Sequence, residues 1–278
     1  MTVLRCGRHT LDLTRPRVMG ILNVTPDSFS DGGRFHDRER ALDHARGMIA
    51  DGADLIDVGG ESTRPGADAV PAPEELARVL PIVATLSSEG TIVSVDTTKP
   101  EVMREAVAAG ASMINDVRAL QEDGALELAA ATDAAIVLMH MRGTPRTMQQ
   151  DTQYDDVVDE VQAFLRSRVD ACRQAGITDD RLALDPGFGF AKDVDDNLKL
   201  LHGLRAIVDL GHPVIVGLSR KSSLGKLTGR LTDERLPASL AAMLAAVARG
   251  ARLVRVHDVR ETVDALTVWD AVNGARGP

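Results

Sequence analysis

Eight short apolar runs recur along the chain, and longer amphipathic stretches alternate with them. The runs are aliphatic without alternation, which is typical of parallel strands buried on both faces. They are Val18–Leu22, Leu55–Ile56, Ile92–Val95, Met113–Ile114, Ile136–Met139, Leu182–Leu184, Val214–Val216 and Leu253–Val256. The stretches predicted to be helices include Asp37–Asp51, Pro73–Glu89, Pro100–Ala109, Tyr154–Ala175 and Leu236–Arg249.

Eight strand–helix units in a chain of 278 residues predict an α/β fold of the TIM (β/α)8 barrel type. A doubly wound open sheet is the alternative, but it usually has fewer strands. Residues Thr2–Thr14, with Gly7-Arg8 at the turn, predict a short N-terminal β-hairpin that caps the bottom of the barrel. No linker divides the chain. We therefore expect a single domain over residues 1–278, with the hairpin in 1–16 and the barrel in 17–275.

The charge balance excludes some classes of partner. The formal net charge is −9, and no basic stripe of the kind that binds nucleic acid is present. No run of 18 apolar residues predicts a membrane span, and the N-terminus lacks the apolar core of a signal peptide. Cys6 and Cys172 lie far apart and match no metal-binding spacing, which favours two reduced thiols over a disulfide. We expect a cytoplasmic protein.

A polar or functional group stands at or near the end of every predicted strand. In a TIM barrel these carboxyl ends form the catalytic face. The groups are Asn23, Asp57, Asp96, Asn115-Asp116, Met139-His140, Asp185, Ser219 and Arg255 to His257. Polar loops alone explain any single end, but they explain Arg255 poorly. It lies inside the apolar sequence Leu253-Val-Arg-Val256, where a charge without a partner costs several kcal/mol.

Two loops near the later strands suggest a ligand that is both planar and anionic. Val216–Leu224 lacks the spacing of a nucleotide-binding P-loop, but it places Lys221 and Ser222-Ser223 at a helix start, where anions are favoured. Taken alone, Lys221 is better explained as a solvated surface lysine. Phe188 and Phe190 lie on a glycine-rich loop, and we expect both to face a planar ligand rather than the core.

The connections after the first two strands are unusually long. Residues Asn23–Asp37 and Gly60–Ala72 exceed what a strand–helix connection needs, and we expect them to close over a substrate. Metal signals are weak, because no His-Glu-x-x-His or paired-cysteine spacing exists. Asn23 with Asp31 would suit Mg²⁺, which takes few protein oxygens and completes its shell with phosphate and water.

Several motifs together resemble one family. The run Met19-Gly-Ile-Leu-Asn-Val-Thr-Pro-Asp-Ser-Phe-Ser-Asp-Gly-Gly33 resembles the first signature of dihydropteroate synthases. The run Gly52-Ala-Asp-Leu-Ile-Asp-Val-Gly-Gly-Glu-Ser-Thr-Arg-Pro-Gly66 resembles the second. Further matches are Ser94–Thr97, Ile114–Val117, Asp185–Phe190, Ser219–Ser222 and Arg255–Asp258. The resemblance covers almost the whole chain.

The resemblance implies a transferase of folate biosynthesis. It joins 6-hydroxymethyl-7,8-dihydropterin diphosphate to 4-aminobenzoate, gives 7,8-dihydropteroate and pyrophosphate, and is a target of sulfonamides. The implied pterin site is Asp96, Asn115, Val117, Met139, Asp185 and Lys221. The implied diphosphate site is Asn23, Thr63, Arg64, Arg255 and His257, with Mg²⁺ bound through Asn23. The implied aminobenzoate site is Thr63, Pro65, Phe190 and Ser222.

Among these residues, Asp96, Lys221, Arg255 and His257 are the expected catalytic groups. The resemblance also implies a homodimer formed through the late helices. Two other functions compete with the synthase: a pterin-binding methyltransferase domain, and a catalytically silent paralogue. The methyltransferase needs no diphosphate clamp, so Arg255, His257 and Lys221 argue against it. The silent paralogue is disfavoured because all the named polar residues are present.

Overall fold

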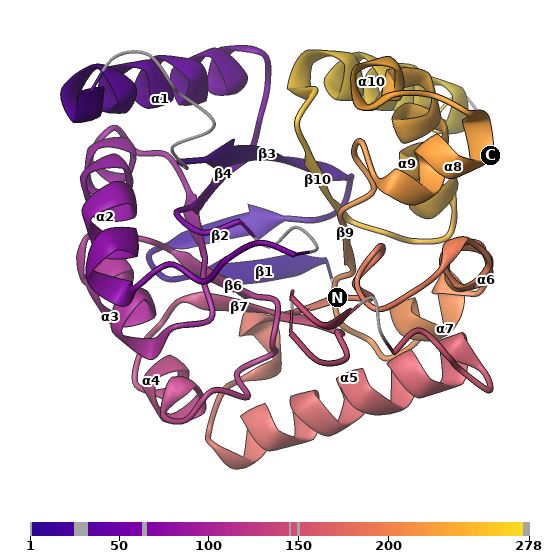
Figure 1. The fold of residues 1–278 in the computed structure, drawn as a ribbon, viewed down its shortest axis with the longest axis horizontal. Coiled ribbons are helices and arrows are strands. Elements are labelled where there is room, and N and C mark those ends of the chain that lie inside the picture. The colour runs from indigo at the N-terminus through magenta and orange to yellow at the C-terminus, as the bar shows by residue number, and fades with distance from the viewer. Residues whose placement is uncertain (1, 25–32, 63–65, 145, 149–150, 275–278) are drawn as a thin grey trace.

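The computed structural model describes residues 2–24, 33–62, 66–144, 146–148 and 151–274. In this part of the chain, eight parallel strands form one sheet in the order β8-β7-β6-β5-β4-β3-β10-β9. The two outer strands also meet: Leu184 and Val214 form a β-bridge, and the Leu184 N–H donates to the Pro213 carbonyl at 2.8 Å. The sheet therefore closes on itself, and the predicted TIM barrel is confirmed (Figure 1).

The predicted strands all form, within three residues of the expected bounds. The barrel strands are β3 (Arg17–Asn23), β4 (Leu55–Gly59), β5 (Val93–Asp96), β6 (Met113–Asp116), β7 (Ala135–Met139), β8 (Leu182–Asp185), β9 (Ile215–Val216) and β10 (Leu253–Val256). The helices that follow them are α1 (Gly33–Ala50), α2 (Ala72–Ser88), α3 (Pro100–Ala108), α4 (Ala125–Ala130), α5 (Val157–Gln174), α6 (Val194–His202), α7 (Leu204–Val208), α8 (Ser222–Thr228), α9 (Leu236–Ala248) and α10 (Val259–Gly274).

Local sequence signals explain where several helices begin and end. Pro100 occupies the first turn of α3, where its missing N–H leaves no hydrogen bond unmade. The Asp156 carboxylate caps α5 by accepting from the N–H groups of Val158 and Asp159, at 2.8 and 3.1 Å. After α3, Gly110 takes a φ of 110°, which an L-residue rarely adopts. These signals are readable in the sequence, which is why the helix bounds could be predicted.

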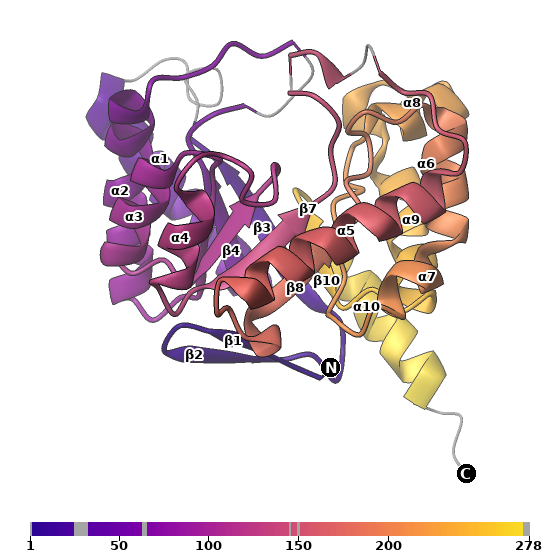
Figure 2. The ribbon, with the colours of Figure 1, turned by 90° about the horizontal axis from the view of Figure 1, so that it is seen from below.

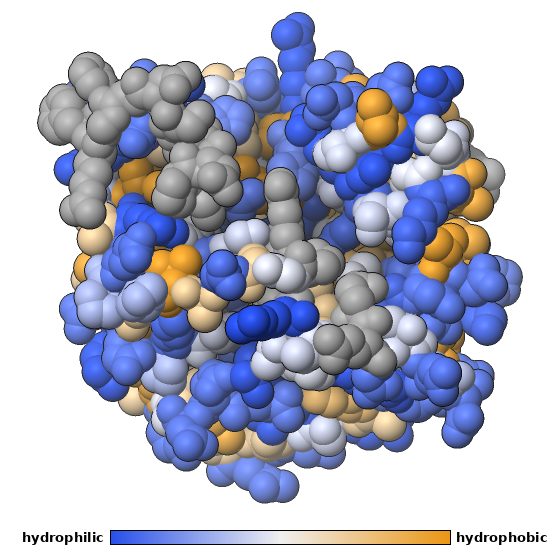
Figure 3. Space-filling model, in the orientation of Figure 1, coloured by the Kyte–Doolittle hydropathy of each residue, from blue (hydrophilic) through white to orange (hydrophobic). Residues whose placement is uncertain are grey.

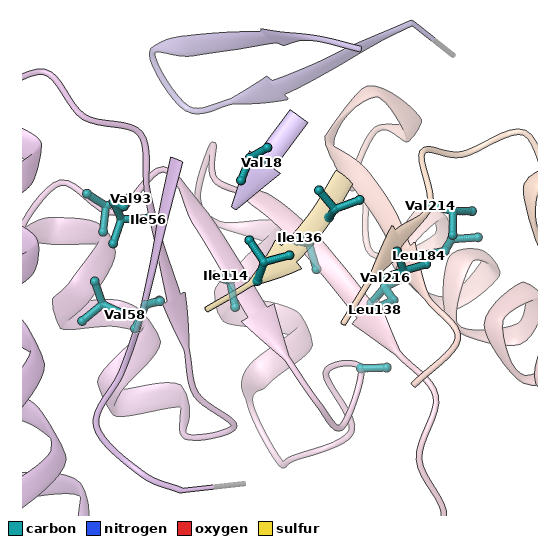
Figure 4. Close-up of a cluster of buried hydrophobic side chains, with 14 of the residues drawn as sticks. Val18, Ile56, Val58, Val93, Ile114, Ile136, Leu138, Leu184, Val214 and Val216 are labelled. Atoms are coloured by element: carbon teal, nitrogen blue, oxygen red, sulfur yellow. The ribbon is translucent and has the colours of Figure 1, made fainter. Parts of the chain in front are cut away.

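The larger core lies between the strands and the surrounding helices. One set of strand side chains points outward into this layer, where helix residues such as Val83 and Leu165 pack against it. Figure 4 shows ten of these strand and strand-flanking residues: Val18, Ile56, Val58, Val93, Ile114, Ile136, Leu138, Leu184, Val214 and Val216. Their neighbours along each strand point into the barrel instead, because side chains alternate across a strand.

The predicted hairpin closes one end of the barrel. Strands β1 (Val3–Cys6) and β2 (His9–Asp12) pair antiparallel, with Gly7-Arg8 between them. Figure 2 shows them lying beneath the barrel. Their buried side chains join the inward-facing residues at the start of the strands in one apolar cluster, formed by Leu4, Cys6, Leu11, Leu13, Met19, Leu55, Met113, Ala135, Val137, Ala183, Ile215 and Leu253. We call this end of the molecule the lower end.

The loops that follow the strands lie at the opposite, upper end (Figure 2). The space-filling view of Figure 3 looks onto this face, which is largely hydrophilic with scattered apolar side chains. Parts of both long loops, including Phe29 and Asp31, lie outside the described residues. No helix in the described part of the chain is long and apolar enough to cross a membrane.

Candidate active site

One pocket at the upper end brings together residues from most of the barrel strands and the loops after them. Its lining is Asp96, Asn115, Val117, Met139, Asp185, Gly187, Phe188, Phe190, Gly217, Lys221 and Arg255. All six residues predicted to bind a pterin are in this set. They are separated by up to 125 positions in the sequence, from Asp96 to Lys221, and the barrel places them around one opening.

Arg255 forms the centre of the charged network beneath this pocket. Its Nε donates to Asp57 Oδ2 at 2.6 Å, and its Nη2 donates to Asp96 Oδ2 at 2.7 Å. Asn115 Nδ2 donates to the same Asp57 oxygen at 3.1 Å. The charge of Arg255 is therefore compensated by two carboxylates, those of Asp57 and Asp96. The third guanidinium nitrogen, Nη1, takes part in neither of these two hydrogen bonds. Charge-assisted hydrogen bonds of this length fix the arginine in one orientation.

The network carries more negative charge than Arg255 alone compensates. Asp57 is fully buried and Asp96 is 6% exposed. One oxygen of each, Oδ1, has no hydrogen-bond partner among the described residues. Burial, together with the nearby carboxylates of Asp57 and Glu75, raises the pKa of Asp96 from 3.8 to about 7, although Arg255 opposes the shift. Buried acceptors without partners are places where a ligand's N–H groups bind well.

Asp185 and Lys221 form a second pair of opposite charges at the pocket. Burial raises the pKa of Asp185, while the Gly187 N–H, which donates to Asp185 Oδ1 at 2.7 Å, and Lys221 both oppose this. Burial lowers the pKa of Lys221 to about 8, and Asp185 limits the fall. The Lys221 ammonium lies 4.3 Å from the centre of the Phe190 ring, which is a cation–π contact. Lys221 is thus a pocket residue rather than a solvated surface lysine.

Of the residues predicted to bind diphosphate, Asn23 and His257 lie at the ends of the neighbouring strands β3 and β10. Asn23 ends β3 and is partly buried, and its Oδ1 lies beside Gly59, as does the Asp96 carboxylate. His257 follows β10, and its Nδ1 is 3.0 Å from Ser219 Oγ, which also accepts from the His257 backbone N–H at 3.2 Å. Ser219 therefore orients the imidazole. Thr63 and Arg64 lie outside the described residues.

The residues predicted to bind aminobenzoate are only partly placed. Phe190 lines the pocket beside Lys221, and Ser222 is exposed as the first residue of α8. Pro65, like Thr63, lies outside the described residues. The structure therefore brings Phe190 to the pocket and places Ser222 next to the pocket residue Lys221 in the chain, and the aminobenzoate site stays a prediction.

Comparison with known proteins identifies the family. The model of the family described as pterin binding enzyme matches residues 19–257. The dihydropteroate synthase of Escherichia coli K12 is 50% identical over 268 residues, which cover 96% of this chain and 95% of that protein. The chain belongs to the dihydropteroate synthase family. The dihydropteroate synthase of Neisseria meningitidis serogroup B is 48% identical over 277 residues, with 97% of each chain covered.

Solved structures of dihydropteroate synthases have the same fold. The Xanthomonas albilineans dihydropteroate synthase with 4-aminobenzoic acid has 54% identity and a TM-score of 0.94, over 100% of this chain and 99% of that one. The Yersinia pestis enzyme in a sulfonamide drug complex has 47% identity and a TM-score of 0.93, over 98% and 99% of the two chains. The Burkholderia cenocepacia enzyme, complexed with 7,8-dihydropteroate, has 49% identity and a TM-score of 0.91, over 99% and 97%.

Two features of this dihydropteroate synthase site differ from the sequence prediction. Phe188 is 2% exposed and packs in the apolar core, although some of its atoms also reach the pocket. The expectation that Phe188 faces a ligand rather than the core is therefore wrong in one respect, because this residue packs in the core as well as lining the pocket. Asp57 was noted only as a strand end, yet it connects Arg255 and Asn115. Its position inside a buried strand was the signal that could have identified it.

A dihydropteroate synthase is expected to use Mg²⁺, and the residues at the rim fit this ion. Asn23 offers a neutral amide oxygen at the barrel mouth, next to Gly59. Mg²⁺ needs only one or two protein oxygens when substrate phosphates and water supply the others. No group of three or more His, Cys, Asp or Glu side chains in the described residues could hold a metal on its own. The site thus fits an ion that arrives with a diphosphate.

Proposed function

We propose that this chain joins 6-hydroxymethyl-7,8-dihydropterin diphosphate to 4-aminobenzoate, giving 7,8-dihydropteroate and pyrophosphate, as a transferase of folate biosynthesis. The observation that supports this most strongly is the pocket in which Asp96, Asn115, Asp185 and Lys221 meet around Arg255. The comparisons support the same reaction, since family members are solved with 4-aminobenzoic acid and with 7,8-dihydropteroate.

The polar groups of the pocket suit a pterin. A pterin ring carries amino and ring N–H donors, and the Asp96 and Asp185 carboxylates offer acceptors in a buried site. Asp96 Oδ1, which has no partner among the described residues, gains one when such a donor binds. Val117 and Met139 supply apolar contact for the ring faces. The pterin is thereby both oriented and removed from water.

The reaction follows a dissociative path. The bond between the pterin methylene and the diphosphate oxygen breaks, and the electron-rich ring spreads the resulting positive charge. The carboxylates of Asp96 and Asp57 lie fixed beneath the pocket and stabilise that charge without reorganising. The aminobenzoate nitrogen then forms the new carbon–nitrogen bond and releases a proton to solvent. An aromatic amine needs no strong base to attack a cation, so the chain's main contribution is positioning and exclusion of water.

The leaving diphosphate meets positive charge on the same rim. The negative charge that grows on the diphosphate is stabilised by Arg255, Lys221 and His257. Arg255 acts through Nη1, because its Nε and Nη2 already donate to Asp57 and Asp96. Asn23 would hold Mg²⁺, which supplies additional positive charge to the diphosphate when bound. Thr63 and Arg64 are proposed to contact the diphosphate, and Thr63, Pro65, Phe190 and Ser222 the aminobenzoate.

A homodimer formed through the late helices accompanies this proposal. Four large apolar side chains on or beside α8 and α10 are well exposed: Leu227 at 58%, Leu231 at 75%, Val268 at 64% and Val272 at 59%. Large apolar side chains that are exposed on the late helices favour association. Sedimentation should therefore give twice the chain mass of 29.7 kDa.

Cys6 and Cys172 are both buried and unpaired, which supports a reducing, cytoplasmic location.

Turnover with both substrates tests the function. The purified chain is mixed with pterin diphosphate, labelled 4-aminobenzoate and Mg²⁺, and pyrophosphate and labelled dihydropteroate are counted. The proposal expects equal amounts of both products. Pyrophosphate without dihydropteroate would indicate hydrolysis, and neither product would indicate a silent paralogue. Either result overturns the proposal.

A further inference from the structure

Lys192 is a buried lysine behind the pocket that the proposed reaction does not use. It is 3% exposed, and its ammonium group has three neighbours at hydrogen-bond distance. They are His140 Nδ1 at 2.9 Å, the Gly187 carbonyl at 3.0 Å and the Phe190 carbonyl at 2.9 Å. Burial lowers the pKa of Lys192 to about 7, and in its ammonium form the three N–H donors match these three partners. All three acceptors are neutral, which makes Lys192 unlike the paired lysine Lys99.

The imidazole of His140 is suited to accept from Lys192. Burial, together with the nearby charges of Lys192 and Arg142, lowers the pKa of His140 to about 2. The ring is therefore neutral, and its Nδ1 has a free lone pair. His140 is itself held in place: its backbone N–H donates to the Asp185 carbonyl at 3.0 Å, and its ring packs edge-on against Phe164 at 5.0 Å. Lys192 thus connects the loop after β8 to a fixed point after β7.

The loop that Lys192 holds has a conformation that needs such support. Gly187, Gly189 and Ala191 have φ values of 71°, 81° and 51°. A side chain at Gly187 would come within 2.0 Å of the His140 carbonyl, so the loop packs tightly against β7. Ala191 takes the left-handed region without being glycine, which carries strain that the surroundings must offset. Asn197 holds the same loop by accepting from the Gly189 N–H at 2.7 Å.

The front of this loop is one wall of the pocket. Gly187, Phe188 and Phe190 line it, and the Phe190 ring lies on the Lys221 ammonium. The Gly187 N–H also donates to the Asp185 carboxylate. Lys192 therefore reaches the backbone of two residues, Gly187 and Phe190, that set where Asp185, Lys221 and the aromatic ring lie relative to a bound pterin.

We propose that Lys192 is a positioning residue of the pterin site, which acts by fixing the Gly187–Phe190 backbone against His140. The proposal rests on the proposed function. Because the loop contacts the pterin in both the ground state and the transition state, its loss removes binding from both equally. KM for the pterin diphosphate then rises while kcat changes little. A merely structural role would instead lower the folded fraction, and with it the apparent kcat, without changing KM.

The test uses Lys192→Met, which keeps the length of the side chain and removes its donors. The matched control is Lys199→Met on the exposed face of α6. We expect Lys192→Met to raise KM for pterin diphosphate at least tenfold, with kcat per folded molecule within threefold of the parent. It should weaken 7,8-dihydropteroate binding, measured by calorimetry, by a similar factor. Lys192→Gln retains up to two donors and should give a smaller rise in KM.

An unchanged KM and an unchanged product affinity in Lys192→Met overturn the proposal. If that variant does not fold, Lys192→Gln decides by the same two readouts, and a KM within twofold of the parent counts against the proposal. Failure of the parent chain to make dihydropteroate contradicts the proposed function instead, so the two failures are distinguishable. Lys199→Met should match the parent in both constants, and a tenfold rise in KM for this control would also remove the argument.

Discussion

The two ends of the barrel are built from the same strands but serve different purposes. At the lower end the inward side chains are Leu55, Met113, Ala183 and Leu253, in a cluster that the hairpin covers. Two residues further along the same strands, on the same inward side, stand Asp57, Asn115, Asp185 and Arg255. On the inward face of each of these strands, an apolar side chain is followed two residues later by a polar or charged one. The lower end stabilises the fold, and the upper end holds charges that a stable core alone would exclude.

Removing Arg255 should have the largest effect on the upper end. Arg255→Ala should lower kcat/KM by at least about 100-fold, or 2–3 kcal/mol, because the leaving group loses its nearest cation. It should also lower the free energy of unfolding by about 3 kcal/mol, since Asp57 and Asp96 are left buried without a counter-charge. Steady-state kinetics and urea unfolding measure both effects.

Two further variants sharpen that result. Arg255→Lys should recover only part of the activity, because a single ammonium cannot contact both carboxylates and the diphosphate as a guanidinium does. Arg260→Ala, at an exposed position of α10, is the matched control and should stay within threefold of the parent. Near-normal kcat/KM in Arg255→Ala would show that the upper end does not depend on this residue.

A change at the lower end should separate stability from activity. Leu4 is fully buried in the hairpin cluster. Leu4→Ala should lower the free energy of unfolding by about 3 kcal/mol through lost burial and a cavity. Activity per folded molecule should stay within twofold, since the hairpin cluster is apolar and lies at the opposite end of the barrel from the pocket. A tenfold fall in kcat/KM for the folded protein would mean that the two ends are coupled.

Asp185→Asn should weaken ligand binding more than it lowers the free energy of unfolding, whereas Leu4→Ala should lower mainly the free energy of unfolding. The substitution keeps the size of the side chain but replaces an acceptor oxygen with a donor. Affinity for 7,8-dihydropteroate, measured by calorimetry, should fall about tenfold, or 1.4 kcal/mol. The free energy of unfolding should change by less, and Asp195→Asn, exposed in the first turn of α6, should leave affinity unchanged. Equal losses of affinity and stability would favour a structural role for Asp185.

The smallest expected effect is the pH dependence of the upper end. The pKa of Asp96 is raised to about 7, and that of Lys221 is lowered to about 8. Because the proposed roles need a carboxylate and an ammonium, kcat/KM should rise with pH up to about 7 and fall above about 8. Lys221→Arg should move the alkaline limit upward, since a guanidinium stays protonated. A profile flat from pH 6 to 9 would contradict these assignments.

The raised pKa of Asp96 also predicts how stability varies with pH. Between its ordinary pKa of 3.8 and about 7, the folded chain holds a proton on Asp96 that the unfolded chain has released. The contribution of Asp96 to stability therefore falls as pH rises through that window and is constant above it. Replacing Asp96 with Asn should remove this slope, which urea unfolding at several pH values would show.

Most of the fold could be predicted because its signals are local. The aliphatic runs give the strands, and Pro100 and the Gly7-Arg8 turn mark where elements begin and reverse. The direction of the barrel then places strand ends such as Asp96 and Asp185 on one face. These residues needed no knowledge of their partners to be identified as candidates.

Contacts between distant residues could not be predicted from the same signals. Arg255 and Asp57 lie 198 positions apart, and nothing in either segment specifies that their side chains meet. The orientation of a ring within a glycine-rich loop depends on φ values such as the 71° of Gly187, so the packing of Phe188 in the core could not be predicted. Nothing in the sequence singles out Lys192 as a buried residue, because a lysine just before a polar helix start is usually solvated.

A crystal structure with 7,8-dihydropteroate tests the central claim most directly. The account predicts the pterin ring at the upper end, within hydrogen-bond distance of Asp96, Asn115 and Asp185, with its aminobenzoate portion leading out past Phe190 towards Ser222. Arg255 should keep its contacts to Asp57 and Asp96. Density for the product elsewhere, such as in the acidic groove between α5 and α6 lined by Asp155, Asp156 and Asp196, would contradict the account.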